Sequence, residues 1–441
     1  MDKFLKQYFI DGCKRSDDLQ VGVEWEKIGV CKDSGKAIGY SGPRGVETIF
    51  KKLMDRFGWQ GVYSKQNIIA LKKQAASITL EPGGQIELSG QKAFSLDENA
   101  SELYAHLEEL KKVSEPLGIA WLGIGVQPIS KLEEIEWVPK ERYKIMREAL
   151  KKRGALTYRM MKQTASIQIS LDYTDEKDAA EKFRLAMAFS PVLVGIFANS
   201  PVLEGKITPF LSARTHIWSQ TAPERTGILQ KAFDPDFKFD DYVEYALDVP
   251  LLFIMRDGKW IPGNGLSFRT YLKKGLRGHT AAPEDWNLHL TTIFTDARLK
   301  NYIEVRSGDC QKKDLGLSIP ALLKGIFYCQ KCRAKAWEML APYSYEQRLR
   351  LRDEASKKGL NTVFGKKKLG ELAWEFVGLA EDGLRRLAEE KPLLKNDLKY
   401  LAPLKNLLKA GLTPAEVLIR CFRKASSQRE RLEKILHCAA I

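Results

Sequence analysis

Four short segments alternate apolar and polar residues with the two-residue period of a β-strand, and this alternation constrains the fold most. They are residues 21–26, 77–88 (around the turn 82–84), 164–172 and 302–306. Alternate residues of a strand point to opposite faces of a sheet, so each segment offers an apolar face to a core and keeps a polar one. The sequence therefore predicts an antiparallel sheet with a distinct polar face.

The polar faces of these segments are rich in carboxylates. Glu24 and Glu26 share one face, Glu81 and Glu87 lie among the polar positions of the second segment, and Glu304 lies in the fourth. Two carboxylates about 5 Å apart repel by about 3 kcal/mol at an effective dielectric constant of roughly 20. If all these acids share one cavity, bound cations must offset the repulsion. The alternative is that the glutamates only keep a water-facing sheet soluble.

Neutral and basic groups accompany the acids. Gln168 lies on an uncharged, oxygen-rich face, and Tyr302 and Arg306 share the face of Glu304. Oxygen ligands without a Cys/His set favour Mg²⁺ over Zn²⁺, and Mg²⁺ in proteins usually serves phosphate groups. The sequence contains no P-loop motif. Residues 123–125 (GIG) begin like a dinucleotide-binding fingerprint but lack its third glycine. A nucleotide is therefore expected to be held through carboxylate-bound metal.

Two other classes of protein are less consistent with the sequence. The formal net charge is +15, but the basic residues near the C-terminus alternate with acids along amphipathic helices, and only Lys366–Lys368 form a run. We interpret them as solvated helical faces rather than a nucleic-acid surface. Residues 185–203 carry no charge, yet Pro191 and Pro201 interrupt them, so we expect a buried helix and not a membrane span.

The order of patterns along the chain predicts an α+β protein. Strand and helix signals mix up to about residue 310 and are followed by almost continuous helix. We expect a catalytic domain over residues 1–335 and a helical C-terminal region, 336–441, packed on it. The seven cysteines are scattered and odd in number, and residues 1–18 lack the pattern of a targeting segment. Both features favour the cytoplasm.

Six motifs resemble one known family. They are 23–27 (VEWEK), 79–90 (TLEPGGQIELSG), 197–201 (FANSP), 214–218 (RTHIW), 245–250 (YALDVP) and 289–294 (HLTTIF). In this order they resemble the plant-type glutamate–cysteine ligases of plants and many bacteria, over roughly residues 5–330. The resemblance implies a glutamine-synthetase-like fold, in which a strongly curved antiparallel sheet of about six strands forms a funnel surrounded by helices.

The resemblance also implies an activity. Members use ATP to convert the γ-carboxylate of glutamate into a γ-glutamyl phosphate, which the amine of cysteine attacks in the first step of glutathione synthesis. The expected partners are glutamate, cysteine, ATP and Mg²⁺, without nucleic acid or membrane, in a monomer or weak homodimer. The open alternatives are a carboxylate–amine ligase with another acceptor and a basic nucleic-acid-binding protein.

Site residues carried over from the resemblance fall into groups by role. Around Mg²⁺-ATP are Glu24, Glu26, Glu81, Glu87 and Glu304; Arg214, Gln168 and Tyr302 bind substrate; Arg306 and Arg147 act on phosphate or the activated carboxyl. Alternatively, Arg306 only pairs with Glu304 and Arg147 is a surface charge. Ser170 stands where the family commonly has Asn, so the role of that position is open. Gly263 and Gly278 correspond to the region of a regulatory cysteine pair in plant enzymes, so that disulfide is not expected here.

Overall fold

The computed structural model describes residues 3–441, and its centre is a nine-stranded antiparallel sheet. The strands run in the order β14-β15-β7-β1-β5-β4-β3-β2, and β6 pairs with β1 beyond this path. Their bounds are β1 Val21–Cys31, β2 Gln60–Ser64, β3 Asn67–Lys73, β4 Ala76–Leu80, β5 Ile86–Ser89, β6 Ile119–Leu122, β7 Ile167–Leu171, β14 Ala297–Leu299 and β15 Ile303–Val305. The family resemblance implied about six strands, and the sheet has nine.

The register of the sheet brings the predicted polar faces together. Glu26 of β1 lies opposite Glu87 of β5, and Glu24 lies opposite Gln168 of β7. On the other side of β7, Glu304 of β15 lies opposite Ser170. Directly opposed residues of an antiparallel pair point to the same face, so all these side chains share one face of the sheet.

Helices α3 (Leu96–Ser114) and α11 (Lys313–Tyr328) cover the opposite, apolar face. Trp25 of β1 points into this layer and is almost fully buried. A Cβ at Gly316 of α11 would lie 2.2 Å from the Trp25 ring, so only glycine lets the helix pack this closely. The uncharged segment begins inside the buried helix α6 (Glu176–Ile196), as expected. Within residues 3–441, no helix is long and apolar enough to cross a membrane.

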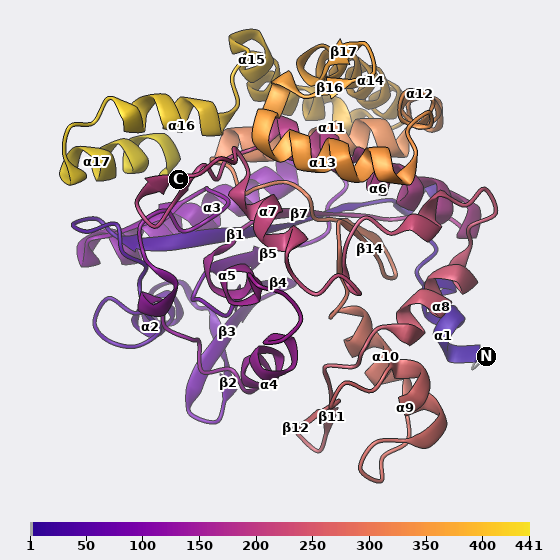
Figure 1. The fold of residues 1–441 in the computed structure, drawn as a ribbon, viewed down its shortest axis with the longest axis horizontal. Coiled ribbons are helices and arrows are strands. Elements are labelled where there is room, and N and C mark those ends of the chain that lie inside the picture. The colour runs from indigo at the N-terminus through magenta and orange to yellow at the C-terminus, as the bar shows by residue number, and fades with distance from the viewer. Residues whose placement is uncertain (1–2) are drawn as a thin grey trace.

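Further helices and short strands complete the first three hundred residues. The helices are α1 Lys3–Ile10, α2 Val46–Phe57, α4 Glu141–Leu150, α5 Thr157–Gln163, α7 Ala213–Ser219, α8 Phe239–Asp248, α9 Phe268–Lys274 and α10 Pro283–Leu290. The short strands are β8 Val202–Leu203, β9 Lys206–Ile207, β10 Thr226–Gly227, β11 Phe253–Arg256, β12 Lys259–Pro262 and β13 Phe294–Thr295. In Figure 1, α2, β2, β3 and α4 form one group below β1, and α8 to α10 with β11 and β12 form another.

The C-terminal helices form a layer along the top of the view in Figure 1. They are α12 Gln330–Leu340, α13 Tyr345–Lys358, α14 Leu369–Glu390, α15 Ala402–Ala410, α16 Pro414–Arg423 and α17 Gln428–Ala439, with the hairpin β16 Val363–Phe364 and β17 Lys367–Lys368. The chain end contacts the sheet directly, because the Gly123 amide donates to the Ala439 carbonyl at 2.9 Å and the Ile441 amide donates to the Trp121 carbonyl at 3.0 Å. These helices are therefore bonded to the body that carries the sheet.

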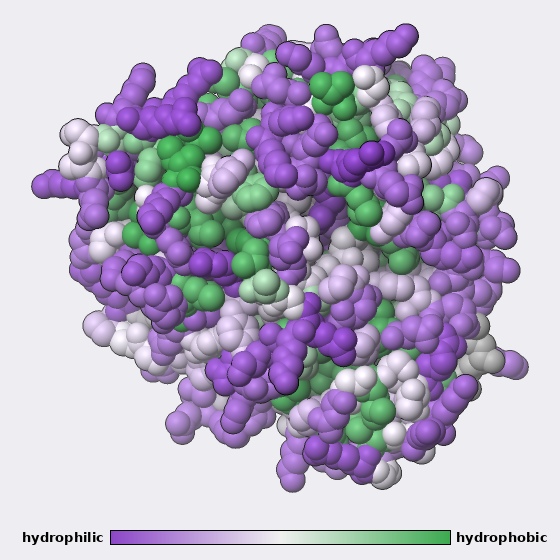
Figure 2. Space-filling model, in the orientation of Figure 1, coloured by the Kyte–Doolittle hydropathy of each residue, from purple (hydrophilic) through white to green (hydrophobic). Residues whose placement is uncertain are grey.

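The molecular surface in the orientation of Figure 1 is mostly hydrophilic. Figure 2 shows hydrophobic side chains on this face in small separate groups, including one near α16 and α17 and one at the lower edge near β11 and β12. Lys366–Lys368, the basic run, lie at the exposed β16–β17 hairpin. Lys367 pairs with Glu375 of α14, so part of that charge is offset locally.

Candidate active site

A cavity of about 220 Å³ opens on the polar face of the sheet. Strands β1, β5 and β7 form one wall, and α4, α5, α7 and the segment around β13 close the others. The polar residues that line it are Glu24, Glu26, Glu81, Gln85, Glu87, Arg142, Tyr143, Thr164, Ser166, Gln168, Arg214, Thr291, Thr292, Arg298 and Arg306. Segments more than two hundred residues apart in sequence thus meet in one hollow.

Four of the predicted acids, Glu24, Glu26, Glu81 and Glu87, line this cavity together. Strand alternation places three of them, and Glu81 begins the turn that joins β4 to β5. A Cβ at Gly83 in this turn would lie 2.2 Å from the Lys162 carbonyl oxygen of α5. The glycine therefore permits a close approach of the two backbones.

Two of these carboxylates are hydrogen-bonded and two are not. Glu26 accepts from the Ser166 amide at 2.5 Å and from the Gln168 side-chain amide at 2.9 Å. Glu87 accepts from the hydroxyls of Thr79 and Ser89 at 3.0 and 2.9 Å. Within residues 3–441, the Glu24 and Glu81 carboxylates have no hydrogen-bond or ion-pair partner.

Burial and mutual repulsion shift Glu24, Glu26 and Glu81 toward their protonated forms. Burial raises the pKa of Glu26 to about 8, and the neighbouring charges of Glu81 and Glu87 add to this effect. Burial likewise raises the pKa of Glu24, with further contributions from Glu304 and Glu87, and it raises the pKa of Glu81 beside Glu87. These carboxyls would therefore gain most from a bound cation, which favours their charged forms.

Glu304 is the exception among the predicted acids. It is fully buried behind the cavity wall, and Arg298 of β14 donates to both of its carboxylate oxygens, at 2.7 and 2.8 Å. Arg306 donates to Glu304 as well, and also to the side-chain oxygen of Gln168. Burial alone would raise the pKa of Glu304, but Arg298 and Arg306 hold it well below its usual value. Glu304 thus anchors two arginines that do line the cavity.

Arg214 enters the cavity from α7. The Ser212 hydroxyl caps this helix by accepting from the Thr215 amide, and it also donates to the buried Asp309 at 2.9 Å. The Arg214 guanidinium donates to the carbonyl oxygens of Arg306 and Ser307 at 2.9 and 3.3 Å, while its buried Nε has no partner among residues 3–441. Burial lowers the pKa of Arg214. A carboxylate ligand would supply both the missing acceptor and a counter-charge.

Besides Glu304, two more predicted site residues do not line the cavity. Arg147 lies farther along α4, where its guanidinium pairs with Glu148 at 3.3 Å and lies 5.4 Å from the centre of the Trp137 ring. Tyr302 precedes β15, and its ring has Lys300 and Lys92 at 4.5 and 4.8 Å from its centroid. Neither residue is among those that line the cavity.

Sequence reasoning missed two arginines of the cavity. Arg298 lies opposite Glu304 in the β14–β15 hairpin. The alternation Ala297-Arg298-Leu299 was the available signal, although three residues are too few to show a period. Arg142 lies near the start of α4 and reaches the cavity. Burial would lower its pKa, but Tyr143 first, and then Glu81 and Glu87, raise it. No local pattern distinguishes Arg142 from Arg147.

The carboxylate oxygens of the cavity suit a hard cation as ligands, although they do not form a complete metal site by themselves. Within residues 3–441, no group of three or more His, Cys, Asp or Glu side chains is arranged to hold a metal ion. Mg²⁺, however, is usually bound by one or two carboxylates together with water and substrate phosphates. The unpartnered oxygens of Glu24 and Glu81 are ligands of this kind. The residues present therefore fit Mg²⁺ bound together with a phosphate.

Comparison of the sequence with known proteins identifies its relatives. The sequence model described as glutamate–cysteine ligase family 2 matches residues 20–437. The chloroplastic glutamate–cysteine ligase B of Oryza sativa subsp. japonica is 37% identical over 421 residues, which cover 95% of this chain and 83% of that protein. The chloroplastic glutamate–cysteine ligase of Arabidopsis thaliana is 37% identical over 418 residues, covering 94% and 78%.

Solved structures share the fold at low sequence identity. The glutamate–cysteine ligase of Francisella tularensis in complex with AMP has a TM-score of 0.57 at 14% identity, over 96% of this chain and 87% of that chain. A bifunctional glutathione synthetase from Pasteurella multocida has a TM-score of 0.51 at 12% identity, over 99% and 53%. These matches and the antiparallel sheet confirm the expected α+β fold of glutamine-synthetase type. Since the family match spans nearly the whole sequence, this chain belongs to glutamate–cysteine ligase family 2.

Proposed function

We propose that this protein joins the γ-carboxylate of glutamate to the amine of cysteine with ATP, the first step of glutathione synthesis. The γ-phosphoryl group of ATP passes to the carboxylate, and ADP leaves. The amine of cysteine then attacks the acyl phosphate, loses a proton and displaces phosphate. One observation carries the proposal: in a chain 37% identical to glutamate–cysteine ligases, carboxylates without bonding partners and arginines line one cavity together.

We assign the phosphate end of ATP to the carboxylate side of the cavity. Glu24 and Glu81 have free oxygens and would hold Mg²⁺, with Glu26 and Glu87 as further ligands. Mg²⁺ supplies charge neutralisation and orientation of the phosphate oxygens. Glu304 is proposed as a positioning residue, since both its oxygens are already bonded to Arg298.

We assign glutamate and the transferred phosphoryl group to the arginines. Arg214 has an unpartnered Nε and the planar guanidinium that suits a carboxylate. Arg306 is held by Glu304 and Gln168, so its guanidinium is fixed before substrate arrives. Arg142 adds a positive charge beside Glu81 and Glu87, where it can contact phosphate oxygens. Fixed cations at the site of developing charge lower the barrier without reorganisation.

A phosphate-release assay tests the metal ligands. Glu81→Gln and Glu24→Gln remove a negative oxygen at nearly constant volume, and we expect kcat to fall roughly 100-fold or more, because each variant weakens the neutralisation of the transferring phosphoryl group. Glu389→Gln, an exposed residue of α14, makes the same charge change away from the cavity and should keep full activity. Full turnover by both cavity variants would refute the assignment.

An acceptor screen tests the substrates. Phosphate release from ATP should require both glutamate and an amine, and mass detection should identify γ-glutamylcysteine as the favoured product. A preference for another amine would support the runner-up, a carboxylate–amine ligase with a different acceptor. Release that needs no amine would contradict both readings.

We further propose that the enzyme works in the cytoplasm as a monomer or weak homodimer, without nucleic acid or membrane. The unbroken basic runs, such as 151–153 and 366–368, are short, and Figure 2 shows no continuous apolar patch on that face. Light scattering across a range of concentrations tests the assembly state. Duplex binding at physiological salt that is tighter than micromolar would contradict the absence of a nucleic-acid partner.

A further inference from the structure

A second, larger cavity lies on the opposite face of the sheet from the candidate active site. Its volume is about 590 Å³, and it lies between α3 and the outward side of β3 to β5. Strand β5 contributes to both hollows, because Glu87 lines the active-site cavity and the next residue, Leu88, lines this one. Sites for small organic ligands usually measure about 300–1,000 Å³, so the volume suits such a ligand.

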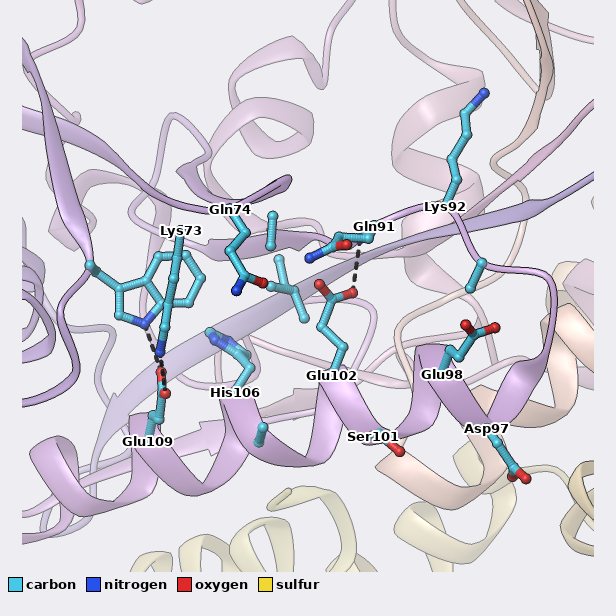
Figure 3. A pocket seen from close by; sticks show the side chains of 15 residues that line it. Lys73, Gln74, Gln91, Lys92, Asp97, Glu98, Ser101, Glu102, His106 and Glu109 are labelled. Carbon is cyan, nitrogen blue, oxygen red and sulfur yellow. Dashed lines mark hydrogen bonds and ion pairs between the residues drawn. The ribbon is translucent and has the colours of Figure 1, made fainter.

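His106 is an unpartnered polar side chain in this cavity. It is 2% exposed, and neither ring nitrogen has a hydrogen-bond partner within residues 3–441. Figure 3 shows the ring on the α3 side of the space, pointing toward Gln74. Burial lowers the pKa of His106 well below its usual value, so the ring is neutral and offers one donor and one acceptor. Buried polar groups normally have partners, and the cavity is where one can reach this ring.

The other free polar groups around His106 are acceptors or amides. Glu102 lies one turn before His106 on α3, and one of its oxygens accepts from the Gln91 amide at 2.9 Å. Burial raises the pKa of Glu102. In Figure 3 the Glu102 carboxylate and the side chains of Gln74 and Gln91 point into the same space as the His106 ring.

The cations at the cavity already have partners. Lys73 donates to Glu109 at 3.0 Å, and Lys92 pairs with Asp172 at 3.0 Å and points away from His106 in Figure 3. Lys27, whose charge acts on His106, donates to the Trp25 carbonyl oxygen at 2.6 Å and does not line the cavity. An anion would therefore find no free positive group, whereas a cation would find Glu102.

From this geometry we propose that the cavity between α3 and β3–β5 binds a small molecule with a primary amine and an apolar part. The ammonium group donates to Glu102, a neighbouring polar atom bonds to His106, and the apolar part packs against Leu88, Ala76 and Trp59. The site is separate from the ligase cavity and does not depend on the proposed reaction.

Binding of 2-phenylethylamine to the full-length protein tests this proposal. The matched probes are 2-phenylethanol, which has the same shape without the charge, and phenylacetate, which has the opposite charge. Calorimetric titration should give saturable binding of the amine, and binding of the other two should be weaker by roughly tenfold or more, since a charge-assisted hydrogen bond is lost. The His106 imidazole nitrogens should shift in a long-range ¹H–¹⁵N spectrum when the amine binds.

Two variants locate the site, and a third controls for charge. Glu102→Gln should weaken binding of the amine roughly tenfold or more without affecting 2-phenylethanol. His106→Gln should abolish the imidazole signal and weaken binding of the amine. Glu108→Gln, on the exposed side of α3, should bind as the wild type does. Each variant is first checked for wild-type melting behaviour, and ligase activity is measured separately.

Two results would overturn the proposal. One is no saturable binding of the amine to the wild type, and the other is equal binding by the wild type and Glu102→Gln. If the wild-type protein bound the amine but had no ligase activity, only the proposed function would be contradicted. Loss of amine binding in Glu102→Gln with full ligase activity would support a separate site.

Discussion

Glu24 and Glu304 show at the scale of single residues how two carboxylates on one face of a sheet acquire opposite properties. Burial raises the pKa of Glu24, because no described residue bonds to its carboxylate. Glu304 is fully buried, yet two arginines lower its pKa. The first is therefore available to a metal ion, and the second is committed to Arg298 and Arg306. Identical side chains at strand positions of the same kind thus suit different roles.

Arg142 and Arg147 provide a matched pair on α4. Arg142 lines the cavity and Arg147 pairs with Glu148 outside it. We expect Arg142→Ala to lower kcat/KM roughly 10- to 100-fold, because a charge-assisted contact to phosphate is lost. Arg147→Ala should change it by less than about twofold, as surface charges usually do. Steady-state kinetics of both variants would check this, and a larger loss in Arg147→Ala would reverse the assignment.

His289 makes stability depend on pH. Its Nε2–H donates to the Ala246 carbonyl at 2.8 Å, and burial lowers its pKa to about 3. In an unfolded chain a histidine titrates near 6.5, so between pH 6.5 and 3 the unfolded state binds a proton that the folded state does not. The free energy of unfolding should therefore decrease as the pH is lowered through this window, and this residue contributes about 1.4 kcal/mol per pH unit.

The variant His289→Gln isolates that contribution, because glutamine can donate to the Ala246 carbonyl but does not titrate. Urea unfolding at pH 7, 6 and 5 should show a shallower pH dependence in the variant, while the other groups titrate equally in both proteins. Parallel curves would show that His289 is protonated in the folded state.

At the scale of elements, one buried ion pair connects α11, the segment before α15 and the start of α3. Lys324 of α11 and Asp397 are 2% and 0% exposed, and Asp397 also accepts from the Leu96 amide at 2.8 Å. This ion pair occupies a buried position that apolar side chains could otherwise fill. Its geometry restricts how the three elements pack together. It is one of the contacts through which the C-terminal helices hold α3 against the sheet.

Removing one partner of this ion pair should lower the free energy of unfolding more than removing both partners. Asp397→Leu leaves the Lys324 charge buried and alone, and we expect unfolding to become easier by about 3–5 kcal/mol. The double variant Lys324→Met/Asp397→Leu should recover most of the loss, because no isolated charge remains. Denaturant unfolding of the two variants measures the difference. Equal stabilities would show that the pair contributes only through packing.

At the scale of the whole molecule, the C-terminal helices complete the body that carries the active site. Arg352 of α13 bonds to Asp296 at 2.6 Å, and the Asp296 carbonyl accepts from the Arg306 amide at 3.0 Å. The carbonyl of Ser356, also in α13, accepts from the amides of Leu211 and Ser212, which precede Arg214. Helix α13 therefore supports the backbone of two cavity arginines.

A chain truncated after residue 335 should not fold into an active enzyme. Removal of residues 336–441 would expose the apolar faces of α6 and α11 and break the bonds to Asp296 and Leu211. We expect the truncated chain to aggregate or to lose cooperative melting, measured by size-exclusion chromatography and calorimetry. A monomeric truncated chain with wild-type kinetics would show that the C-terminal region is dispensable.

The amino-acid sequence by itself determined the strands and the acids of the site. Alternation of apolar and polar residues is a local property, so it placed Glu24, Glu26 and Glu87 on the polar face of the sheet, and all three line the cavity together with Glu81 of the turn. The motifs in their order indicated the family, which the relatives confirm.

Only the tertiary structure decided which charges meet across the cavity. Arg142 and Arg298 enter it while Arg147 and Tyr302 do not, and Glu304 is bonded to arginines instead of facing the cavity. The reason is physical: a helix presents residues to several sides, and its packing fixes which side faces the sheet. Burial and the distances between charges set the pKa values and decide which polar atoms are left without a hydrogen-bond partner. Both are defined only once distant segments have come together.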